Sequence, residues 1–467
     1  MIADLKPYAD YKDSGLPWLG QVPAHWRTVR NGSLFGQRSQ TGYAELPILE
    51  VSLKTGVQVR SFGQAGRKQI MSDLGKYKRA VKGDLAYNTM RMWQGALGVC
   101  PVDGLVSPAY VVARPYPGVD ARYFAALFRT GDYMAEIDSA SRGIVKDRNR
   151  LYWDQFKQMQ SPCPPPDEQV AIMRFLDWVS SRLERAIRAK RKVLALLTEQ
   201  KQAIIRGAVT RGLDPTVPFK DSRIAWIEPI PKHWEVLSLK RVLSRLIDCE
   251  HKTAPLVDQS PYRVVRTTAV RHGALRMRGT YCTSPIAFGA WTRRGKPEPG
   301  DVIFTREAPA GEACVVPEGL SVCLGQRTVL MKPNKQRLNS DLLVHMIYAG
   351  PPGTAISLAT QGSTVGHFNM SDIGALTILL PPKTEQDEIV AAILERTAGL
   401  ERTITRFEGE INLLREYRTR LVADVVTGKL DVRDAAARLP DDFAPDVAVE
   451  PDDETDAAEF INEETEA

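Results

Sequence analysis

The chain has 467 residues, of which 43% are hydrophobic and 25% are charged, and its formal net charge is +6. This length predicts about three domains and argues against a single compact one. The composition is typical of a globular protein, and no run approaches the roughly 18 to 20 apolar residues that a membrane span needs. We therefore expect no transmembrane helix.

The first ten residues mix Asp4, Lys6, Pro7 and Asp10 with few apolar side chains, so they lack the apolar segment of a secretory signal. The cysteines form no Cys-x-x-Cys pair, which argues against a zinc knuckle and a disulfide framework. The six are Cys100, Cys163, Cys249, Cys282, Cys314 and Cys323. We expect a cytoplasmic protein whose cysteines are reduced and mostly packed.

The charge is unevenly distributed along the chain. Residues 440 to 467 contain twelve Asp or Glu and no Lys or Arg. The rest of the chain has 62 basic residues against 44 acidic ones (56 less 12), which gives a net charge of +18. Such an excess attracts polyanions and makes binding sensitive to salt, so nucleic acid is the leading candidate partner. The alternative is a basic surface without a specific ligand.

An internal repeat organises the chain. Its opening consists of an aromatic-Lys-Asp-Ser sequence followed by Trp, Pro and His-Trp, and the second copy lies 208 residues after the first. The first copy is Tyr11-Lys12-Asp13-Ser14 with Trp18, Pro23, His25 and Trp26, and the second is Phe219-Lys220-Asp221-Ser222 with Trp226, Pro231, His233 and Trp234. We expect the two His-Trp pairs to pack in the core at the edge of a domain rather than to contact a ligand.

Between each opening and the next motif lies a segment rich in Gly, Pro and short β-type runs, at residues 11 to 163 and 219 to 380. Gly83–Tyr87 and Gly300–Phe304 are examples of such runs, and a shorter helix is predicted near 121–137 and 340–348. Each segment is therefore a mixed α and β domain of about 150 residues. The repeated motifs surround two segments whose sequences diverge, which indicates different specificities; a duplication kept only for stability is the alternative.

A second motif closes each segment, with an offset of 217 residues. Pro164-Pro165 before Glu168-Gln169 recurs as Pro381-Pro382 before Glu385-Gln386, and Val209-Thr210 before Leu213-Asp214 recurs as Val426-Thr427 before Leu430-Asp431. The stretch between these motifs predicts a long helix in each half. Pro166 and the acidic Asp167 and Glu168 favour the start of the first helix, and Gly212 and Gly428 favour the two ends.

Apolar or long side chains recur in steps of three and four along both helices, as in the seam of a coiled coil. The first seam is Ile172, Leu176, Val179, Leu183, Ile187, Lys190, Leu194, Leu197, Lys201, Ile204 and Ala208. The second is Ile389, Ile393, Arg396, Leu400, Ile404, Phe407, Ile411, Leu414, Arg418, Leu421 and Val425. At about 1.5 Å per residue, 40 residues give a rod of roughly 60 Å, so we expect the helices to pack on each other as a spacer. The alternative is that each helix covers its own domain.

The chain lacks the motifs of several enzyme classes. It has no Gly-x-x-x-x-Gly-Lys-Ser/Thr loop, no Gly-x-Gly-x-x-Gly, and no Asn/Asp-Pro-Pro-Tyr/Phe motif of an adenine methyltransferase. We expect no cofactor, metal or catalytic centre in this chain. Two Glu-x-Lys triplets leave open a metal-dependent nuclease, with Asp248, Glu250 and Lys252 as its residues; the other triplet, Glu199 to Lys201, lies on the first long helix.

The divergent segments hold clusters of side chains suited to reading DNA, since Arg pairs with guanine edges, Asn and Gln pair with adenine edges, and Lys or Ser more often holds phosphate. In the first half these are Asn88, Arg91, Trp93, Gln94, Arg142, Lys146, Arg148 and Asn149. In the second they are Arg263, Arg266, Arg271, Arg276, Arg278, Arg293, Arg294, Arg306, Gln326, Arg327, Gln361, Ser363, Thr364 and His367. For each single residue, a solvated charge or a structural hydrogen bond is the alternative.

This pattern resembles the specificity subunits of type I restriction-modification enzymes. The resemblance rests on the Lys-Asp-Ser, Trp, Pro and His-Trp openings, the Pro-Pro and Glu-Gln motifs and the two long helices, and it covers about residues 11 to 433. It implies an α+β fold with two tandem target recognition domains separated by two long helices that pack as a coiled-coil spacer. The expected division is 1–163 and 213–380 for the domains, 164–212 and 381–432 for the helices, and 433–467 for an acidic, disordered tail.

The resemblance also implies a function. Each recognition domain would read one part of an asymmetric, split DNA site, and the helices would set the number of unread base pairs between the parts. The implied partners are double-stranded DNA, modification subunits that methylate adenine with S-adenosylmethionine, and a restriction subunit that uses ATP and Mg²⁺. A non-DNA scaffold with a coiled-coil arm remains an alternative, and the tail would either aid solubility or suppress non-specific binding.

Overall fold

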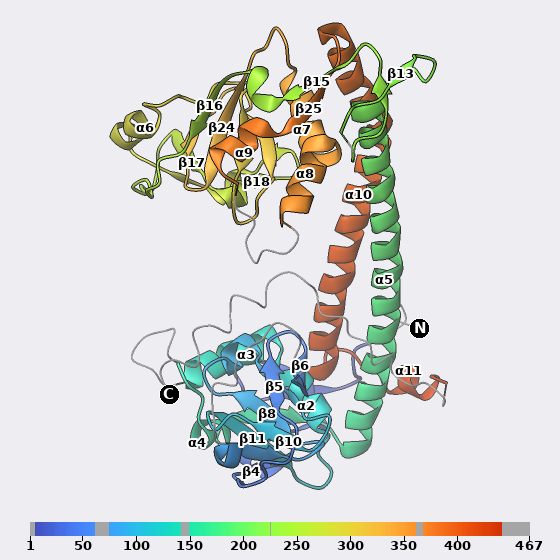
Figure 1. Cartoon of the computed structure of the whole chain (residues 1–467). Helices are drawn as coiled ribbons and strands as arrows, with labels where there is room; N and C mark the ends of the chain where they lie inside the picture. The colour runs from blue at the N-terminus through green and yellow to red at the C-terminus, as the bar shows by residue number, and fades with distance from the viewer. Residues whose placement is uncertain (1–4, 61–73, 142–148, 225, 361–367, 441–467) are drawn as a thin grey trace. The chain divides into compact units, whose positions relative to one another are not determined.

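The computed structural model describes residues 5–60, 74–141, 149–224, 226–360 and 368–440 (Figure 1). The chain divides into two units, Met1–Ala189 with Glu410–Ala467 and Lys190–Gly409. Each unit therefore combines a mixed domain with parts of both long helices. The predicted α+β class with an internal repeat is confirmed.

The two long helices are α5 (Pro166–Arg211) and α10 (Lys383–Val426). Pro166 stands at the start of α5 with Asp167 and Glu168 in its first turn, where the missing proline N–H costs nothing and the carboxylates face the positive helix end. Gly212 and Gly428 follow the helices with φ angles of +74° and +80°. This left-handed backbone ends both helices, as the sequence predicted.

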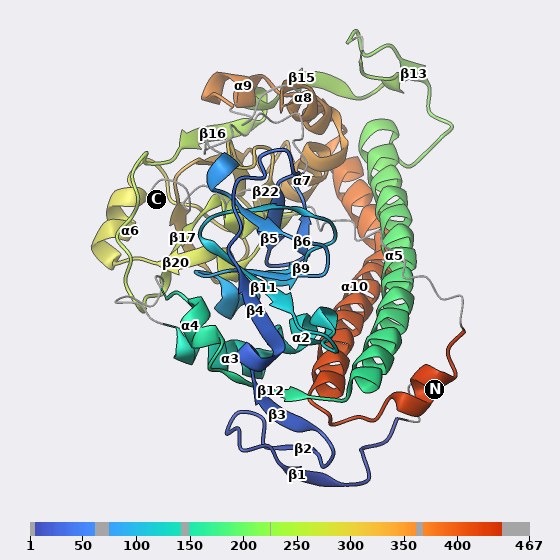
Figure 2. The same cartoon turned by 90° about the horizontal axis from the view of Figure 1, so that it is seen from below.

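In each unit the parts of α5 and α10 that belong to it lie side by side (Figures 1 and 2). In the first unit Arg418 is paired with Glu184. In the second, Lys201 Nζ lies 2.8 Å from Glu401, and Lys190 Nζ lies 4.8 Å from the centre of the Phe407 ring. Three of the four cations predicted in the seam, Lys190, Lys201 and Arg418, therefore find partners on the opposite helix.

The seam prediction fails at one position. Arg396 is exposed, and its neighbour Thr397 is buried in its place, where its hydroxyl donates to the Ile393 carbonyl at 2.8 Å. A threonine satisfies its hydroxyl on the preceding turn, which a strict apolar pattern does not reveal.

The ends of the helices belong to the domain cores, in line with the alternative that each helix covers a domain. The first core includes Ile172 and Phe175 from the start of α5 and Val425 from the end of α10. The second includes Val209 from the end of α5 and Ile389 from the start of α10. Each domain thus packs on the helix that follows it and on the end of the other helix.

Glu168 joins α5 to the first domain. It accepts hydrogen bonds from Trp26 Nε1 at 2.9 Å and from the Tyr8 hydroxyl at 2.5 Å, and His25 Nε2 lies 2.7 Å from its second oxygen. Trp26 is fully buried. Burial, together with the bond to Glu168, raises the pKa of Tyr8 far above its usual value, so the hydroxyl remains a donor.

Glu385 repeats this arrangement at the start of α10. It accepts from Trp234 Nε1 at 3.1 Å and faces His233 Nε2 at 2.7 Å. The two tryptophan rings are buried, as expected of the His-Trp pairs, whereas His25 and His233 are exposed at 40% and 42% and only face the glutamates.

The glutamine beside each glutamate holds the next helix of its domain. Gln169 donates to the Pro164 carbonyl at 2.9 Å and accepts from the backbone N–H of Asp120, the N-cap of α2. Gln386 does the same with Pro381 and with Asn339, the N-cap of α7. The Pro-Pro and Glu-Gln motif is therefore structural.

The first domain is built around a four-stranded antiparallel sheet in the order β4-β11-β8-β9. Its strands are β1 (Tyr11–Asp13), β2 (Gln21–Pro23), β3 (Arg27–Arg30), β4 (Phe35–Arg38), β5 (Leu49–Ser52), β6 (Gly56–Val59), β7 (Lys78–Ala80), β8 (Leu85–Asn88), β9 (Leu97–Val99), β10 (Gly104–Val106), β11 (Tyr110–Pro115) and β12 (Gln160–Cys163). The hairpin β1–β2 lies next to the pair β3–β12 (Figure 2), where Thr28 donates to the Ser14 carbonyl at 3.0 Å.

The first domain contains α1 (Asn31–Leu34), α2 (Ala121–Phe128), α3 (Gly131–Ala140) and α4 (Trp153–Phe156). The single helix predicted over 121–137 is in fact two, because Thr130 caps α3 with its side chain and interrupts the helix. Their aromatic residues Tyr123, Phe128 and Tyr133 fill the core.

The second domain repeats the four-stranded sheet as β16-β24-β21-β22 and adds a three-stranded sheet, β20-β17-β23. Its strands are β13 (Phe219–Lys220), β14 (Ile230–Pro231), β15 (Glu235–Ser238), β16 (Leu243–Asp248), β17 (Tyr262–Val265), β18 (Val270–Arg271), β19 (Ala274–Leu275), β20 (Thr280–Cys282), β21 (Val302–Thr305), β22 (Ala313–Val315), β23 (Ser321–Leu324), β24 (Thr328–Pro333) and β25 (Thr377–Leu380). The helices are α6 (Pro285–Trp291), α7 (Ser340–Ala349), α8 (Pro351–Thr360) and α9 (Met370–Ala375).

The repeated Gly-Asp sequence precedes equivalent strands, β8 and β21. Asp84 receives a two-pronged contact from Arg38 at 2.6 and 3.2 Å, and Asp301 lies 2.9 Å from Lys332 Nζ. Each aspartate also accepts a backbone N–H of the preceding turn, at 2.9 Å in the first domain and 2.8 Å in the second. These buried carboxylates hold the strands in register.

All six cysteines are free thiols, and burial raises the pKa of Cys100, Cys314 and Cys323 to about 12. Among the described residues no single helix is long and apolar enough to cross a membrane; the bent pair Ser340–Ala349 and Pro351–Ala359 meets that test by length and composition alone.

The segment after α10 departs from the disordered tail predicted from residue 433. Arg433–Ala437 form α11, and Ala435, Ala436 and Leu439 are buried. These small apolar side chains give the segment a face to pack, which the acidic composition of the whole tail concealed. The rest of the predicted tail, residues 441–467, lies outside the described residues.

Replacing Gly428 by alanine should destabilise the chain by about 2 to 4 kcal/mol, because a Cβ there needs a left-handed backbone and would overlap Pro23 and approach Trp26 to 3.0 Å. The matched control is Gly399→Ala on α10, where a Cβ meets nothing within 4 Å and should stabilise by about 0.5 to 1 kcal/mol. Urea unfolding followed by tryptophan fluorescence compares the midpoints. Equal midpoints for Gly428→Ala and the unchanged chain would contradict the helix-end packing.

Candidate nucleic-acid interface

One edge of the second domain gathers the loops that follow several strands. The register of the sheet places Asp248 opposite Val329 and Thr305 opposite Thr328, so β16 and β21 end where β24 begins. The strand β23 ends at the same edge, where Gly325 donates to the Val265 carbonyl at 2.9 Å. The loops after β16, β21 and β23 therefore lie together, although they are far apart in the sequence.

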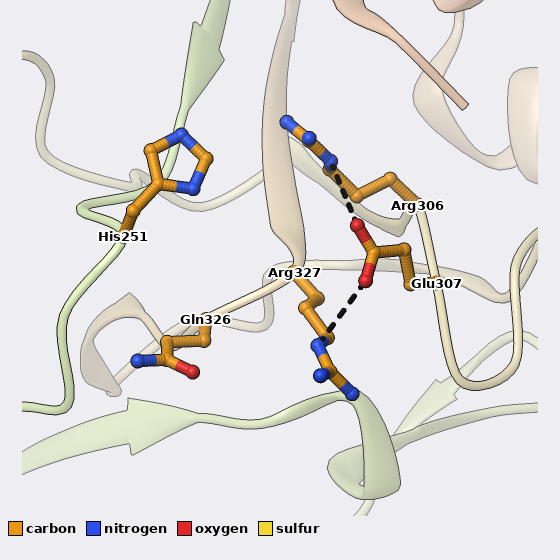
Figure 3. A pocket seen from close by; sticks show the side chains of 5 residues that line it. All are labelled: His251, Arg306, Glu307, Gln326 and Arg327. Carbon is orange, nitrogen blue, oxygen red and sulfur yellow. Dashed lines mark ion pairs between the residues drawn. The ribbon is translucent and has the colours of Figure 1, made fainter. Parts of the chain in front are cut away.

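A polar pocket of about 130 Å³ opens at this edge (Figure 3). It is lined by His251, Arg306, Glu307, Gln326 and Arg327. Glu307 lies between the two arginines, with one oxygen 3.2 Å from Arg327 Nε and the other 3.8 Å from Arg306 Nε. The structure thus brings Arg306, Gln326 and Arg327, all predicted from the sequence, into one site.

Two residues that line this pocket, His251 and Glu307, were not among the candidates for DNA contact predicted from the sequence. An acidic residue among basic ones is a poor candidate for a surface that faces phosphates, so Glu307 gave no positive signal. Its position directly after Arg306 was the available clue, because a carboxylate beside a cluster of arginines can orient a guanidinium.

The carboxylates of the nuclease alternative are engaged by arginines. Arg306 Nη1 donates to both oxygens of Asp248, at 3.1 and 2.9 Å, and Arg294 Nε lies 3.4 Å from Glu250. In the part of the chain that the structure describes, no group of three or more His, Cys, Asp or Glu could hold a metal ion. The geometry therefore does not favour a metal-dependent nuclease.

The remaining predicted arginines of the second domain divide into two groups. Arg266, Arg276, Arg278 and Arg293 are exposed. Of these, Arg266 also donates to the Gly279 carbonyl at 3.2 Å and lies 5.7 Å from the centre of the Tyr281 ring. By contrast, Arg271 donates to carbonyls of its own turn at 3.1 Å, Arg263 contacts Thr280 at 3.4 Å, and Arg294 contacts the Cys249 carbonyl at 3.4 Å. The second group is at least partly structural.

Two predicted groups lie outside the described residues. They are Arg142, Lys146 and Arg148 in the first half, and Gln361, Ser363, Thr364 and His367 in the second.

In the first domain, the predicted residues from 88 to 94 form the loop after β8. Asn88 is buried, and its side chain accepts from the Met90 N–H at 2.9 Å. Trp93 Nε1 donates to the Met90 carbonyl at 2.9 Å. These two side chains shape the loop, whereas Arg91 is partly exposed and Gln94 is exposed.

The same loop contacts a later segment in both domains. Leu151 donates its N–H to the Thr89 carbonyl at 2.9 Å, and Phe368 donates to the Arg306 carbonyl at 3.1 Å. The offset is 217 residues in both cases. In the first domain this contact brings Asn149, which donates to Asp138 at 3.1 Å, toward the loop after β8. Equivalent loops thus meet at equivalent edges with different side chains.

Comparison with known proteins adds to this geometry. No protein-family model matches the chain. The type I restriction enzyme EcoKI specificity subunit of Escherichia coli (strain K12) is 25% identical over 293 residues, which are 60% of this chain and 60% of that protein. The chain is a homologue of this specificity subunit. It spans 60% of the length of that relative.

Solved structures share the fold. A chain from work on complex assembly and conformational transition of the type I R-M system matches with a TM-score of 0.58 at 17% identity, covering 88% of this chain and 99% of that one. The HsdS subunit from Thermoanaerobacter tengcongensis matches at 17% identity with a TM-score of 0.40, covering 88% of this chain and 98% of that one. The first likeness supports an arrangement of two mixed domains and two long helices for this homologue of a specificity subunit.

Replacing Asp248 by asparagine should destabilise the second domain by about 1 to 3 kcal/mol, because it leaves the largely buried Arg306 without its nearest charged partner. It should not alter Mn²⁺ binding, since the carboxylates already face arginines. Thermal unfolding and titration of Mn²⁺ followed by electron paramagnetic resonance measure the two effects. The control is Lys252→Ala, an exposed member of the same triplet. Saturable Mn²⁺ binding that disappears in Asp248→Asn would revive the nuclease alternative.

Proposed function

We propose that this chain is the DNA-reading specificity subunit of a type I restriction-modification complex. Each domain would read one part of an asymmetric, split DNA site. The observation that carries the proposal is the pair of equivalent sheet edges, where the loops present Arg91 and Gln94 in one domain and Gln326 and Arg327 in the other. Different donor patterns cannot read the same base pairs, so the two parts of the site should differ.

Charge supports a nucleic-acid ligand. The chain without residues 440 to 467 carries +18, and the pocket edge of the second domain concentrates arginines. Phosphate contacts from such side chains would position the chain on DNA, and contacts to base edges would select the sequence. A scaffold that does not bind DNA would not require this charge.

The chain would act through partners. The homologous specificity subunit and the resemblance in sequence motifs support modification subunits that methylate adenine with S-adenosylmethionine, and a restriction subunit that uses ATP and Mg²⁺. The cofactors would then be bound by the partners, with no catalytic residue in this chain. The long helices would set the number of unread base pairs.

Selection from a random duplex library tests the reading function. The full chain, with a modification subunit, should enrich one sequence made of two unlike parts separated by a fixed gap, and added salt should weaken its binding. Enrichment of one continuous site, or binding without sequence preference, would refute a two-domain reader.

Lengthening both helices tests the role of the gap. Seven residues inserted after Leu194 and seven after Ile404 keep the seam in phase and add about 10 Å, since each helical residue rises about 1.5 Å. The gap between the two parts should grow by about three base pairs at 3.4 Å each, with both parts unchanged. Altered base preferences with an unchanged gap would contradict the spacer role.

A further inference from the structure

We infer that Arg327 reads a guanine in the major groove and that Glu307 is the residue that positions it. This inference rests on the proposed DNA-reading function and names one contact of the second domain. It concerns the pocket of Figure 3, where an exposed guanidinium is fixed by a carboxylate at the edge of the four-stranded sheet.

The guanidinium of Arg327 is oriented before any ligand binds. Its Nε lies 3.2 Å from Glu307, which leaves the two terminal amino groups for another partner, and its side chain is 55% exposed. Guanine presents two acceptors, O6 and N7, side by side in the major groove, and a pair of guanidinium N–H groups matches them. Because the side chain is already held in place, it loses less conformational entropy when DNA binds.

Glu307 is itself fixed by the pocket. Its second oxygen faces Arg306 Nε at 3.8 Å, and Arg306 is anchored on both oxygens of Asp248. The Arg306 side chain is only 12% exposed, so it is poorly placed to reach a base. The row Asp248, Arg306, Glu307, Arg327 therefore alternates in charge and ends in the one exposed guanidinium.

The backbone also directs Arg327 outward. Its φ is +66°, a left-handed conformation that residues other than glycine rarely adopt and that clusters at functional sites. The Arg306 N–H donates to the Arg327 carbonyl at 3.0 Å, which ties this residue to the loop after β21. Two residues earlier, a Cβ on Gly325 would lie 2.6 Å from the Val265 carbonyl oxygen, so the loop can pack this closely only with glycine.

The first domain has no arginine at the two equivalent positions. Thr89 follows β8 as Arg306 follows β21, and Ala109 precedes β11 as Arg327 precedes β24. Neither side chain can make a two-pronged contact with guanine. Loss of Arg327 should therefore affect one part of the split site and leave the other unchanged.

The experiment compares the full chain with Arg327→Ala, Arg327→Lys and Glu307→Gln in the duplex selection. Arg327→Ala and Arg327→Lys should both lose a guanine preference at one position by about tenfold to a hundredfold, the usual value of one such contact. Lysine keeps the charge but not the planar fork. Glu307→Gln should weaken the same preference and no other, and circular dichroism checks that each variant folds.

The matched control is Arg337→Ala. Arg337 is 45% exposed and faces Glu235 at 3.5 Å beyond the other end of β24, so this variant also loses one charge from an arginine–glutamate pair. Its base preferences should remain those of the unchanged chain.

A second measurement uses the selected site with 7-deazaguanine at the assigned position, which removes the N7 acceptor. The unchanged chain should lose affinity for this duplex, and Arg327→Ala should bind both duplexes equally. If Arg327→Ala instead weakens binding to all sequences alike and reduces its salt dependence, Arg327 contacts phosphate and the inference is wrong. If Glu307→Gln leaves every preference intact, the positioning role is wrong. If the unchanged chain selects no sequence, the proposed function itself fails.

Discussion

A glutamate at the start of each long helix, buried in the first domain and partly buried in the second, holds the architecture together. Glu168 and Glu385 each accept a hydrogen bond from a buried tryptophan and face a histidine at 2.7 Å. A carboxylate removed from water is costly unless charged or polar donors surround it, so the tryptophan and histidine have to come from the opening of the domain. This requirement joins the opening of each domain to the closing motif at the start of the following helix, about 140 to 150 residues later in the sequence.

The same junctions also bind the end of the other helix. A Cβ on Gly428 would overlap Pro23 next to Trp26, and a Cβ on Gly212 would make tight contacts with Glu385 at 3.1 Å and Trp234 at 3.3 Å. Each domain therefore depends on one helix that starts in it and one that ends in it. Because both junctions use the same motif, the long helices can pair in each unit while the segments between motifs are free to change. These contacts constrain the opening and closing motifs of each domain. They do not involve the strand ends at the opposite edge of the sheet.

Much of the arrangement of repeated motifs and long helices was predictable from the sequence, because these parts occur twice. Equal offsets identified the openings, the Pro-Pro and Glu-Gln motifs and both helix ends, and three- and four-residue steps identified the long helices. The sequence was less informative where a local hydrogen bond overrides a pattern: Thr397 is buried in place of Arg396, and Thr130 caps a new helix inside the predicted one. The pocket was only partly predictable, since composition marks arginines as candidates but cannot show which of them a neighbour has fixed. Arg271 and Arg327 look equivalent in sequence, yet one is bound to its own turn and the other is exposed beside Glu307.

Under the proposed function, that difference would allow one set of repeated motifs and long helices to carry two specificities. The positions directly after β8 and β21, and directly before β11 and β24, are set by strand register, which buried Asp84 and Asp301 help to hold. Arg327 occupies one of these positions with a side chain that is 55% exposed, so a substitution there changes which donors face outward, whereas Arg306 is held by Asp248. The left-handed backbone of Arg327 places the conformational strain in the loop. Sequence divergence between the domains is therefore expected to concentrate at strand ends of this edge, where, under the proposed function, a single residue would alter base selection while the contacts of Glu168 and Glu385 remain intact.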